Sequence, residues 1–186
     1  SVKSPDEFSP KSRWLDIKNY IHSTPLDDAI KENILNVYKE LAEAEAFVHG
    51  CEMNEVHFHE IASYETFINI LGVCIGIDFF KPKMIFCMPP PVGSGYVKTS
   101  HGLLPVPVPT VLEIAKRNRI KILGGENFPS EELTTPTGIA LMSLFANKFE
   151  QPSSYEVLKT GVGLGSKDFG CPNMLRICKI QNLEFE

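Results

Sequence analysis

Two histidines separated by one residue form the strongest candidate for chemistry in this sequence of 186 residues. His57 and His59 flank Phe58, and Glu60 follows them directly. Side chains two apart in a β-strand point to the same side, so a strand here would present both imidazoles together. Such a pair suits a borderline divalent ion such as zinc or nickel. Glu60 could then accept an imidazole N–H or act as a base.

A polar face on the following predicted helix supports this hypothesis. Glu65, Asn69 and Gly72 are spaced four and three residues apart, so they share one face of an otherwise apolar helix. Burying the carboxylate and the amide costs roughly several kcal/mol unless both find partners. The nearby histidines are suitable partners, which predicts a polar cleft between strand and helix. A metal-binding cleft and a hydrogen-bonded network without metal explain these residue types equally well.

A glycine-rich segment is a candidate for binding phosphate. Gly93, Ser94 and Gly95 would let a ligand approach the backbone, and Lys98 could pair with a phosphate. An ordinary turn between extended segments explains the same residues. His101 follows closely and is a candidate third metal ligand, a candidate base or a polar loop residue.

Two further segments are candidates for binding an anion. Thr135 and Thr137 flank a proline at a predicted helix start, where free N–H groups and hydroxyls could hold phosphate. N-capping alone explains that motif as well. Arg176 follows three alternating glycines, residues 161 to 165, and could pair with phosphate or equally with a surface carboxylate. The glycine spacing differs from a dinucleotide-binding fingerprint.

The elements that must position these residues alternate along most of the chain. This alternation predicts an α/β fold with a mixed sheet, packed helices and an N-terminal helical pair, with α+β as the alternative. Apolar spacing predicts helices over residues 13–22, 24–50, 63–76, 110–119 and 135–147. Apolar runs predict strands over residues 55–59, 83–88, 120–123, 155–162 and 174–180, the last two antiparallel. Residues 1–50 would form a lead-in and the helical pair, and residues 51–186 an α/β core that carries the site.

Local signals predict where several helices begin and end. Thr24 precedes a proline and is a predicted N-cap, and Gly50 is a predicted C-terminal stop. Thr110 and Glu113 have the spacing of a capping box. The helix over residues 63–76 is apolar around most of its circumference, which predicts that it is buried.

The composition argues against several classes of protein. A formal net charge of −5 is unlike a nucleic-acid-binding protein, which needs clustered lysine and arginine. The best apolar run, residues 67–80, is too short for a membrane span and contains Asn69 and Asp78. No secretory leader is recognisable, and the 5 cysteines include no CxxC pair. We therefore expect a cytoplasmic protein with reduced thiols, no nucleic-acid partner and no membrane partner.

Four groups of residues, taken in order, resemble the nickel insertion proteins of nickel-pincer cofactor synthesis. The resemblance spans about Arg13 to Arg176. The four groups are Leu41-Ala-Glu-Ala-Glu-Ala46 and Val48-His49-Gly50 through His57 to Glu60; Gly93-Ser-Gly-Tyr-Val97 with His101-Gly-Leu-Leu-Pro-Val-Pro107; Glu132-Leu-Thr-Thr-Pro-Thr-Gly138; and Gly161, Gly163 and Gly165 with Asp168, Asn173 and Arg176.

The resemblance implies an enzyme of the lyase class that places nickel between two thiocarboxylate sulfurs of a pyridinium mononucleotide and consumes CTP. His57 and His59 would hold the ion, and Glu60, Glu65 and His101 would orient or supplement them. Neutral imidazoles suit transient nickel binding, because the ion must leave for the sulfur ligands. The phosphate would be held by the remaining candidates: Gly93, Ser94, Gly95, Lys98, Thr135, Thr137 and Arg176.

The chain departs from the family pattern in ways that leave alternatives open. The family carries Asp where this chain has Glu65 and Asn69, which lowers the expected metal affinity. A degenerate, non-catalytic module that binds nucleotide or metal is therefore one alternative, and a metal-assisted hydrolase using His57, His59 and His101 is another. We expect CTP and a second divalent cation only with the family's C-terminal domain, which this sequence lacks. That domain and a second copy of the chain are candidate partners.

Overall fold

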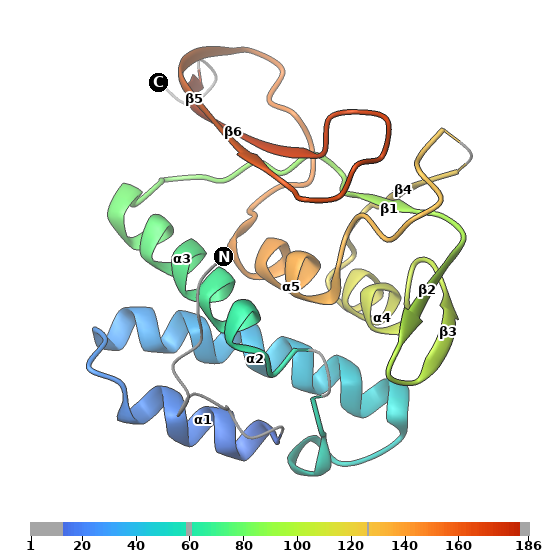
Figure 1. Ribbon diagram of the computed structural model, residues 1–186. Helices are drawn as coiled ribbons and strands as arrows, with labels where there is room; N and C mark the ends of the chain where they lie inside the picture. Colours follow the sequence, from blue (N-terminus) through green and yellow to red (C-terminus); the bar gives the residue numbers. More distant parts are fainter. Residues whose placement is uncertain (1–12, 59–60, 126, 183–186) are drawn as a thin grey trace. The chain divides into compact units, whose positions relative to one another are not determined.

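The computed structural model describes residues 13–58, 61–125 and 127–182, and the chain divides into two compact units, residues 1–149 and 150–186. The predicted N-terminal helical pair belongs to the first unit together with the helices that follow it (Figure 1). The α-helices of the described chain are α1 (Trp14–Ser23), α2 (Asp28–His49), α3 (Tyr64–Phe80), α4 (Pro109–Arg117) and α5 (Pro136–Phe145).

The described strands pair two by two. In the first unit, β1 (Pro91–Gly93) pairs in parallel with β4 (Leu123–Gly124), and β2 (Tyr96–Thr99) pairs antiparallel with β3 (Gly102–Pro105). The second unit is an antiparallel hairpin, whose strands are β5 (Tyr155–Leu164) and β6 (Met174–Asn182). The α/β class with parallel and antiparallel pairing is thus confirmed, as is the predicted antiparallel pair near the end of the sequence. The mixed pairing is distributed over three two-stranded sheets among the described residues.

Helix α2 is the central element of the first unit. It contacts α1, α3, α4 and α5, with α1 on one side and α4 and α5 on the other (Figure 1). Its predicted apolar stripe is confirmed: Ile34, Val37 and Leu41 are fully buried, and the small Ala44 between neighbouring helices is buried too. Fully burying one large apolar side chain stabilises the fold by roughly 1.5–3 kcal/mol. This stripe therefore fixes where the surrounding helices lie.

The ends of α2 agree only in part with the sequence signals. Gly50 ends the helix in the left-handed region at φ 65°, as predicted. The predicted start was wrong, because the helix begins at Asp28. Thr24 instead lies at the end of α1, where its hydroxyl donates to the carbonyl oxygen of Ile21 at 2.7 Å. A threonine hydroxyl can cap either end of a turn, so the sequence alone favoured the wrong partner.

The predicted strand over residues 55–59 was wrong in its described part. Met53–Glu55 form a 3-10 turn, η1, and His57 makes only an isolated antiparallel bridge with Arg13. The turn includes Glu55, the residue at which the predicted strand would have begun. Phe58 is buried and His57 is exposed, so these two neighbours do point in different directions. His59 and Glu60 lie outside the described residues.

Two other predicted strands are shorter than expected. Within residues 83–88 only Phe86 is bridged, to Lys148. Within residues 120–123, only Leu123 belongs to a strand, at the start of β4. Pro89, Pro90 and Pro91 have no backbone N–H to donate, so a regular ladder does not continue from residues 83–88 into the segment that follows.

Helix α3 is longer than predicted and buries only one of its faces. Phe67, Ile70 and Cys74 are spaced along that face and are buried. The prediction that the whole helix is buried was wrong, since large apolar side chains on its other faces are exposed. These side chains are Val73, Ile75, Phe79 and Phe80.

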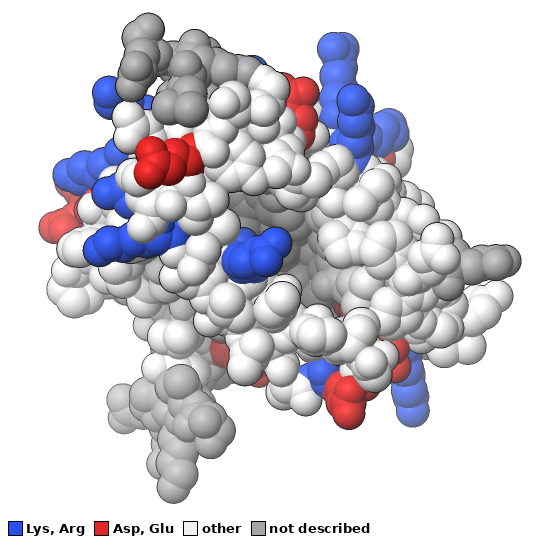
Figure 2. Space-filling view, turned by 90° about the horizontal axis from the view of Figure 1, so that it is seen from above, with Lys and Arg blue, Asp and Glu red and all other residues white. Residues whose placement is uncertain are grey.

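No helix in the described part of the chain is both long enough and apolar enough to cross a bilayer. All five cysteines have free thiols, and burial raises the pKa of the Cys74 thiol to about 12. On the face shown in Figure 2, lysine and arginine side chains lie in small separate groups among many uncharged residues.

A buried hydroxyl in the core generates a first prediction. Tyr38 is fully buried, its ring centroid lies 6.2 Å from that of Phe58, and its hydroxyl has no hydrogen-bond partner among the described residues. Leaving a buried hydroxyl unpaired costs about 1–3 kcal/mol. We expect Tyr38→Phe to raise the free energy of unfolding by about 1 kcal/mol in urea denaturation. A decrease would mean that the folded protein satisfies this hydroxyl.

Candidate functional site

The first unit contains a cavity of about 710 Å³. Its wall is formed by the C-terminal end of α2, the segment after η1, the N-terminal ends of α3, α4 and α5, and the turn of the β2–β3 hairpin. Small-molecule sites in proteins have volumes of roughly 300–1,000 Å³. The cavity is therefore large enough for a ligand the size of a mononucleotide.

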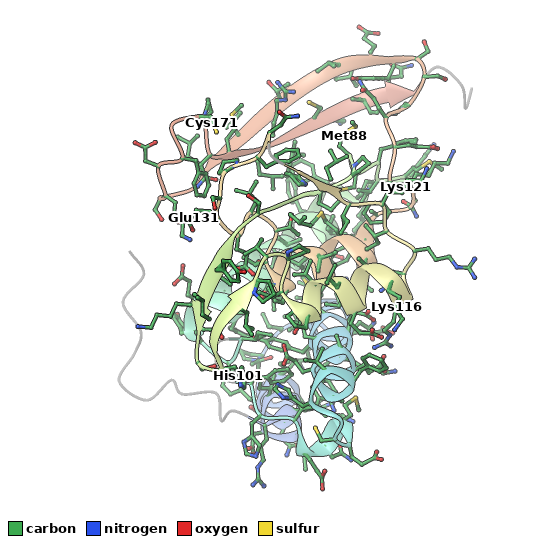
Figure 3. The ribbon with its side chains drawn as sticks, turned by 90° about the vertical axis from the view of Figure 1, so that its right-hand side faces the viewer. Met88, His101, Lys116, Lys121, Glu131 and Cys171 are labelled. Atoms are coloured by element: carbon green, nitrogen blue, oxygen red, sulfur yellow. The ribbon has the colours of Figure 1, made fainter. Side chains whose placement is uncertain are left out.

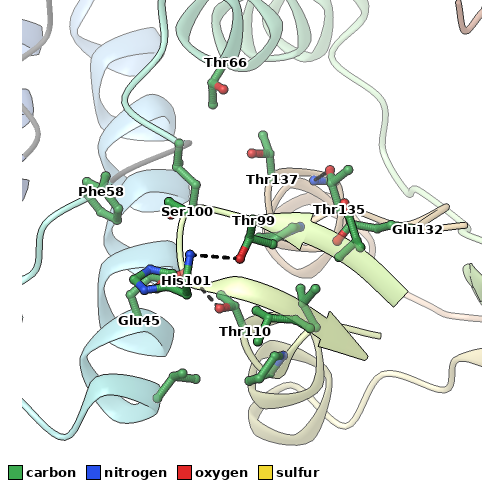
Figure 4. A pocket seen from close by; sticks show the side chains of 18 of the residues that line it. Glu45, Phe58, Thr66, Thr99, Ser100, His101, Thr110, Glu132, Thr135 and Thr137 are labelled. Atoms are coloured by element: carbon green, nitrogen blue, oxygen red, sulfur yellow. Dashed lines mark hydrogen bonds between the residues drawn. The ribbon is translucent and has the colours of Figure 1, made fainter. Parts of the chain in front are cut away.

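Three helices direct their N-terminal ends to this cavity. Thr66 of α3, Thr110 of α4 and Thr137 of α5 all lie in its lining. Figure 4 shows the side chains of Thr66 and Thr137 projecting toward the space between their helices. A helix N-terminus carries unpaired N–H groups and a partial positive charge of about half an elementary charge. The ends of α3 and α5 consequently favour a negatively charged group, whereas the end of α4 already lies beside the Glu45 carboxylate.

The start of α5 is held in place by its own hydrogen bonds. Thr135 caps the helix, since its hydroxyl oxygen accepts the Gly138 N–H at 3.2 Å. The preceding Thr134 is buried, and its hydroxyl donates to the carbonyl oxygen of Pro91 in β1 at 2.6 Å. Thr135 thus performs the capping role that the sequence allowed, while Thr137 also lines the cavity without acting as the cap.

A second group of polar side chains lies at the opposite side of the cavity. The Thr110 hydroxyl donates to Glu45 Oε1 at 2.8 Å, and His49 Nε2 lies 3.3 Å from Glu45 Oε2. The rings of His49 and His101 are in contact, with centroids 4.9 Å apart. The predicted capping box at Thr110 was wrong, because α4 begins at Pro109 and the Thr110 hydroxyl binds Glu45 instead.

His101 reaches this group because it lies in the turn of the β2–β3 hairpin (Figures 3 and 4). Thr99 pairs with Gly102 across the turn, so only Ser100 and His101 connect the two strands. The Thr99 hydroxyl accepts the His101 N–H at 3.1 Å and donates to the Gly102 carbonyl oxygen at 3.1 Å. These bonds fix the backbone that carries His101.

The structure brings five of the sequence-predicted site residues to the cavity. They are His57, Glu65, His101, Thr135 and Thr137. His59 and Glu60 lie outside the described residues. Glu65 and Asn69 are exposed, so the expected buried polar network on α3 is not formed by these two side chains.

The predicted phosphate-binding glycines occupy a different position. Gly93, Ser94, Gly95 and Lys98 are absent from the described residues that line the cavity. A Cβ at Gly93 would lie 1.9 Å from the carbonyl oxygen of Glu131, and this glycine has a φ of 84°. Close packing of two backbone segments therefore explains Gly93 without a ligand.

Arg176 lies in the second unit, on β6, where it is opposite Val162 of β5 and exposed. The glycines before it do not form a helix start. Gly165 N–H donates to the Asn173 carbonyl oxygen at 2.8 Å where the two strands begin to separate. The alternating glycines thus belong to the end of a β-hairpin.

Sequence reasoning assigned no role to Glu45 or His49 and gave Thr110 only a capping role. Glu45 and His49 are four residues apart near the end of α2, so they share one face of that helix. That spacing was a usable signal, but only the fold shows that the face meets His101. In the described ranges, no three histidine, cysteine, aspartate or glutamate side chains form a group that could hold a metal ion.

Comparison with known proteins finds a matching family and relatives by sequence. The family model described as "Nickel insertion protein" matches residues 2–185. The chain is 40% identical over 162 residues to the pyridinium-3,5-bisthiocarboxylic acid mononucleotide nickel insertion protein of Clostridium acetobutylicum, covering 87% of this chain and 38% of that protein. It is 38% identical to the protein of the same name from Clostridium kluyveri, covering 87% and 40%. The chain thus spans about two fifths of these relatives. No solved structure matches it.

The glycine geometry generates a second prediction. Gly93 and Gly102 both have positive φ, 84° and 101°, but only Gly93 has backbone atoms where a Cβ would be placed. Both substitutions add φ strain of about 1–3 kcal/mol, so that contribution cancels in the comparison. Because only the Gly93 Cβ also meets backbone atoms, we expect Gly93→Ala to lower the free energy of unfolding by about 2 kcal/mol more than Gly102→Ala. Urea midpoints of the two variants test this. Equal losses would contradict the close packing at Gly93.

Proposed function

Because this chain belongs to the nickel insertion protein family, we propose that its cavity binds a pyridinium mononucleotide and holds Ni²⁺ as the substrate for transfer to that nucleotide, a step of nickel-pincer cofactor biosynthesis. The name of the Clostridium relatives supplies the nucleotide and its two thiocarboxylic acid groups. The observation that carries the proposal is one cavity lined both by imidazoles and by the N-terminal ends of α3 and α5.

The helix N-termini are suited to the phosphate of the mononucleotide. Thr137 offers a backbone N–H and a hydroxyl in the first turn of α5, and Thr66 offers a hydroxyl from α3. Unpaired N–H groups and the helix dipole bind phosphate in many proteins. The proposed phosphate site is therefore the α5 start with Thr135 and Thr137. We propose no phosphate contact for Gly93, Ser94, Gly95 or Lys98, since packing explains Gly93 and none of the four lines the cavity.

The histidine side of the cavity is suited to the ion. His57 and His101 both line it, and neutral imidazoles are favourable ligands for nickel. We propose that His57 and His59 hold Ni²⁺, with Glu60, Glu65 and His101 orienting or supplementing them. Thiocarboxylate sulfur is a softer and charged ligand, so it can withdraw the ion from a few neutral nitrogens.

In the proposal, some steps of the reaction need parts of the full-length relatives that this chain does not match. CTP consumption and a second divalent cation are assigned to the part of the full-length relatives that the chain does not match. Arg176 would contact phosphate only from the second unit. We place the activity in the cytoplasm, which is consistent with the five free thiols.

A non-catalytic binding module is the second candidate function. Asn69 lines the cavity at a position where the family resemblance implies Asp, so the cavity wall has one negative charge less. An amide there weakens attraction for a cation without closing the nucleotide site. The metal-assisted hydrolase would use His57, His59 and His101, of which His59 lies outside the described residues, and no observation favours it over insertion.

Nucleotide binding provides a third prediction. We expect Thr137→Val to weaken binding of the thiolated pyridinium mononucleotide about tenfold, because a hydrogen bond to a charged group contributes about 1.5–3 kcal/mol. Ser143→Ala is the matched control, since Ser143 is on the same helix but its hydroxyl bonds the Ala140 carbonyl oxygen. Isothermal titration calorimetry measures both affinities. Equal weakening in the two variants would point to a general effect on α5.

Nickel transfer provides a fourth prediction. The chain is incubated with the thiolated mononucleotide, NiCl₂ and the separately produced C-terminal domain of a full-length relative, with and without CTP, and the nickel-containing nucleotide is quantified by mass spectrometry. We expect His57→Ala to lower its yield about tenfold relative to the unchanged chain, because one imidazole ligand is lost. If the unchanged chain binds the nucleotide but yields no product with CTP, the binding module is the correct function for this chain.

A further inference from the structure

We propose that His49 and His101 form a second Ni²⁺ position in the cavity, beside the one proposed for His57 and His59, and that Glu45 is the positioning residue of His49. The identity of the ion rests on the function proposed above. The residues come from the group in which α2, α4 and the β2–β3 turn meet at the cavity, and His101 is the one member of that group with a role in that function.

The separation of the two imidazoles matches a shared ion. A divalent metal binds an imidazole nitrogen at about 2.0–2.1 Å, and two such ligands on one ion place their ring centroids roughly 5 Å apart. The centroids of His49 and His101 are 4.9 Å apart, with an angle of 47° between the ring planes. Both residues line the cavity, so an ion between them is accessible to a ligand bound there.

The carboxylate of Glu45 has the arrangement of a residue that orients a metal-binding histidine. Its Oε2 lies 3.3 Å from His49 Nε2, and its Oε1 accepts the Thr110 hydroxyl at 2.8 Å. The Glu45 side chain is only 15% exposed, so both oxygens are held by the fold. Histidines that bind metals commonly donate their second ring N–H to such a carboxylate, which leaves Nδ1 of His49 for the ion.

A two-histidine site is consistent with the lack of any three-ligand group among the described residues. Zinc or nickel sites that keep an ion permanently use three or four protein ligands. An ion that must be delivered to two sulfur atoms needs open positions, which water fills before the nucleotide arrives. Two imidazoles and no directly bound carboxylate provide such positions.

The test measures Ni²⁺ affinity of the purified chain by competition with a chromophoric chelator. We expect His49→Ala and His101→Ala each to weaken binding at least tenfold, and Glu45→Gln to weaken it about tenfold. His22→Ala and Glu43→Gln are the matched controls, since neither residue lines the cavity, and both should bind as the unchanged chain does. Circular dichroism checks that each variant is folded.

A measurement on the unchanged chain complements the variants. Substoichiometric Ni²⁺ should broaden the imidazole proton NMR signals of His49 and His101 before those of His22. Unaltered affinity in His49→Ala would overturn the inference, and so would an unbroadened His49 signal. A loss confined to His57→Ala would overturn it too, but would still support the proposed function. Mononucleotide binding, measured separately, decides whether that function fails as well.

Discussion

The burial of one apolar stripe on α2 is the interaction on which the first unit depends. Ile34, Val37 and Leu41 are fully buried, and four other helices contact this one. The wall of the cavity consists mainly of helix ends, the β2–β3 hairpin and the segment after η1. The packing of the helices in the core sets the positions of their ends. The geometry of a cavity lined by helix ends therefore depends on that core. Substitutions that remove this apolar stripe would therefore destabilise the fold and also separate the residues that line the cavity.

The same packing gives the cavity two electrically different sides. The N-terminal ends of α3 and α5 bring partial positive charge, whereas α2 ends at His49 and brings partial negative charge. The N-terminal end of α4 lies beside the end of α2, where the Thr110 hydroxyl donates to the Glu45 carboxylate. An anion is therefore favoured beside α3 and α5, and a cation beside Glu45 and the end of α2. The nickel ion is a cation and the nucleotide phosphate is an anion, so each suits one of these two sides. The proposed ligands can thus be oriented by backbone dipoles before any charged side chain contacts them.

The sequence predicted the parts of the fold that depend on local patterns. The stripe on α2, the stop at Gly50 and the antiparallel β5–β6 pair needed only spacing and turn residues to be recognised. The strand at His57 failed because a 3-10 turn at Met53–Glu55 competes for the same residues. Glu45 and His49 were given no role at the site because His49 contacts His101, more than 50 residues away, only in the folded chain. The spacing of residues within one helix does not predict which turn of the chain that helix will contact.

In the proposed function the site has to bind its ion weakly enough to release it, and the polar face of α3 fits that requirement. Glu65 and Asn69 are exposed on the cavity wall and are not drawn into a buried ligand cluster. Asn69 belongs to α3, on the side of the cavity proposed for the nucleotide, where a carboxylate would repel the thiocarboxylate groups that have to approach. A neutral amide removes that repulsion, while the imidazoles on the other side hold the ion. Asn69 is thus compatible with nickel transfer, because it affects the approach of the nucleotide and not the ligands of the ion.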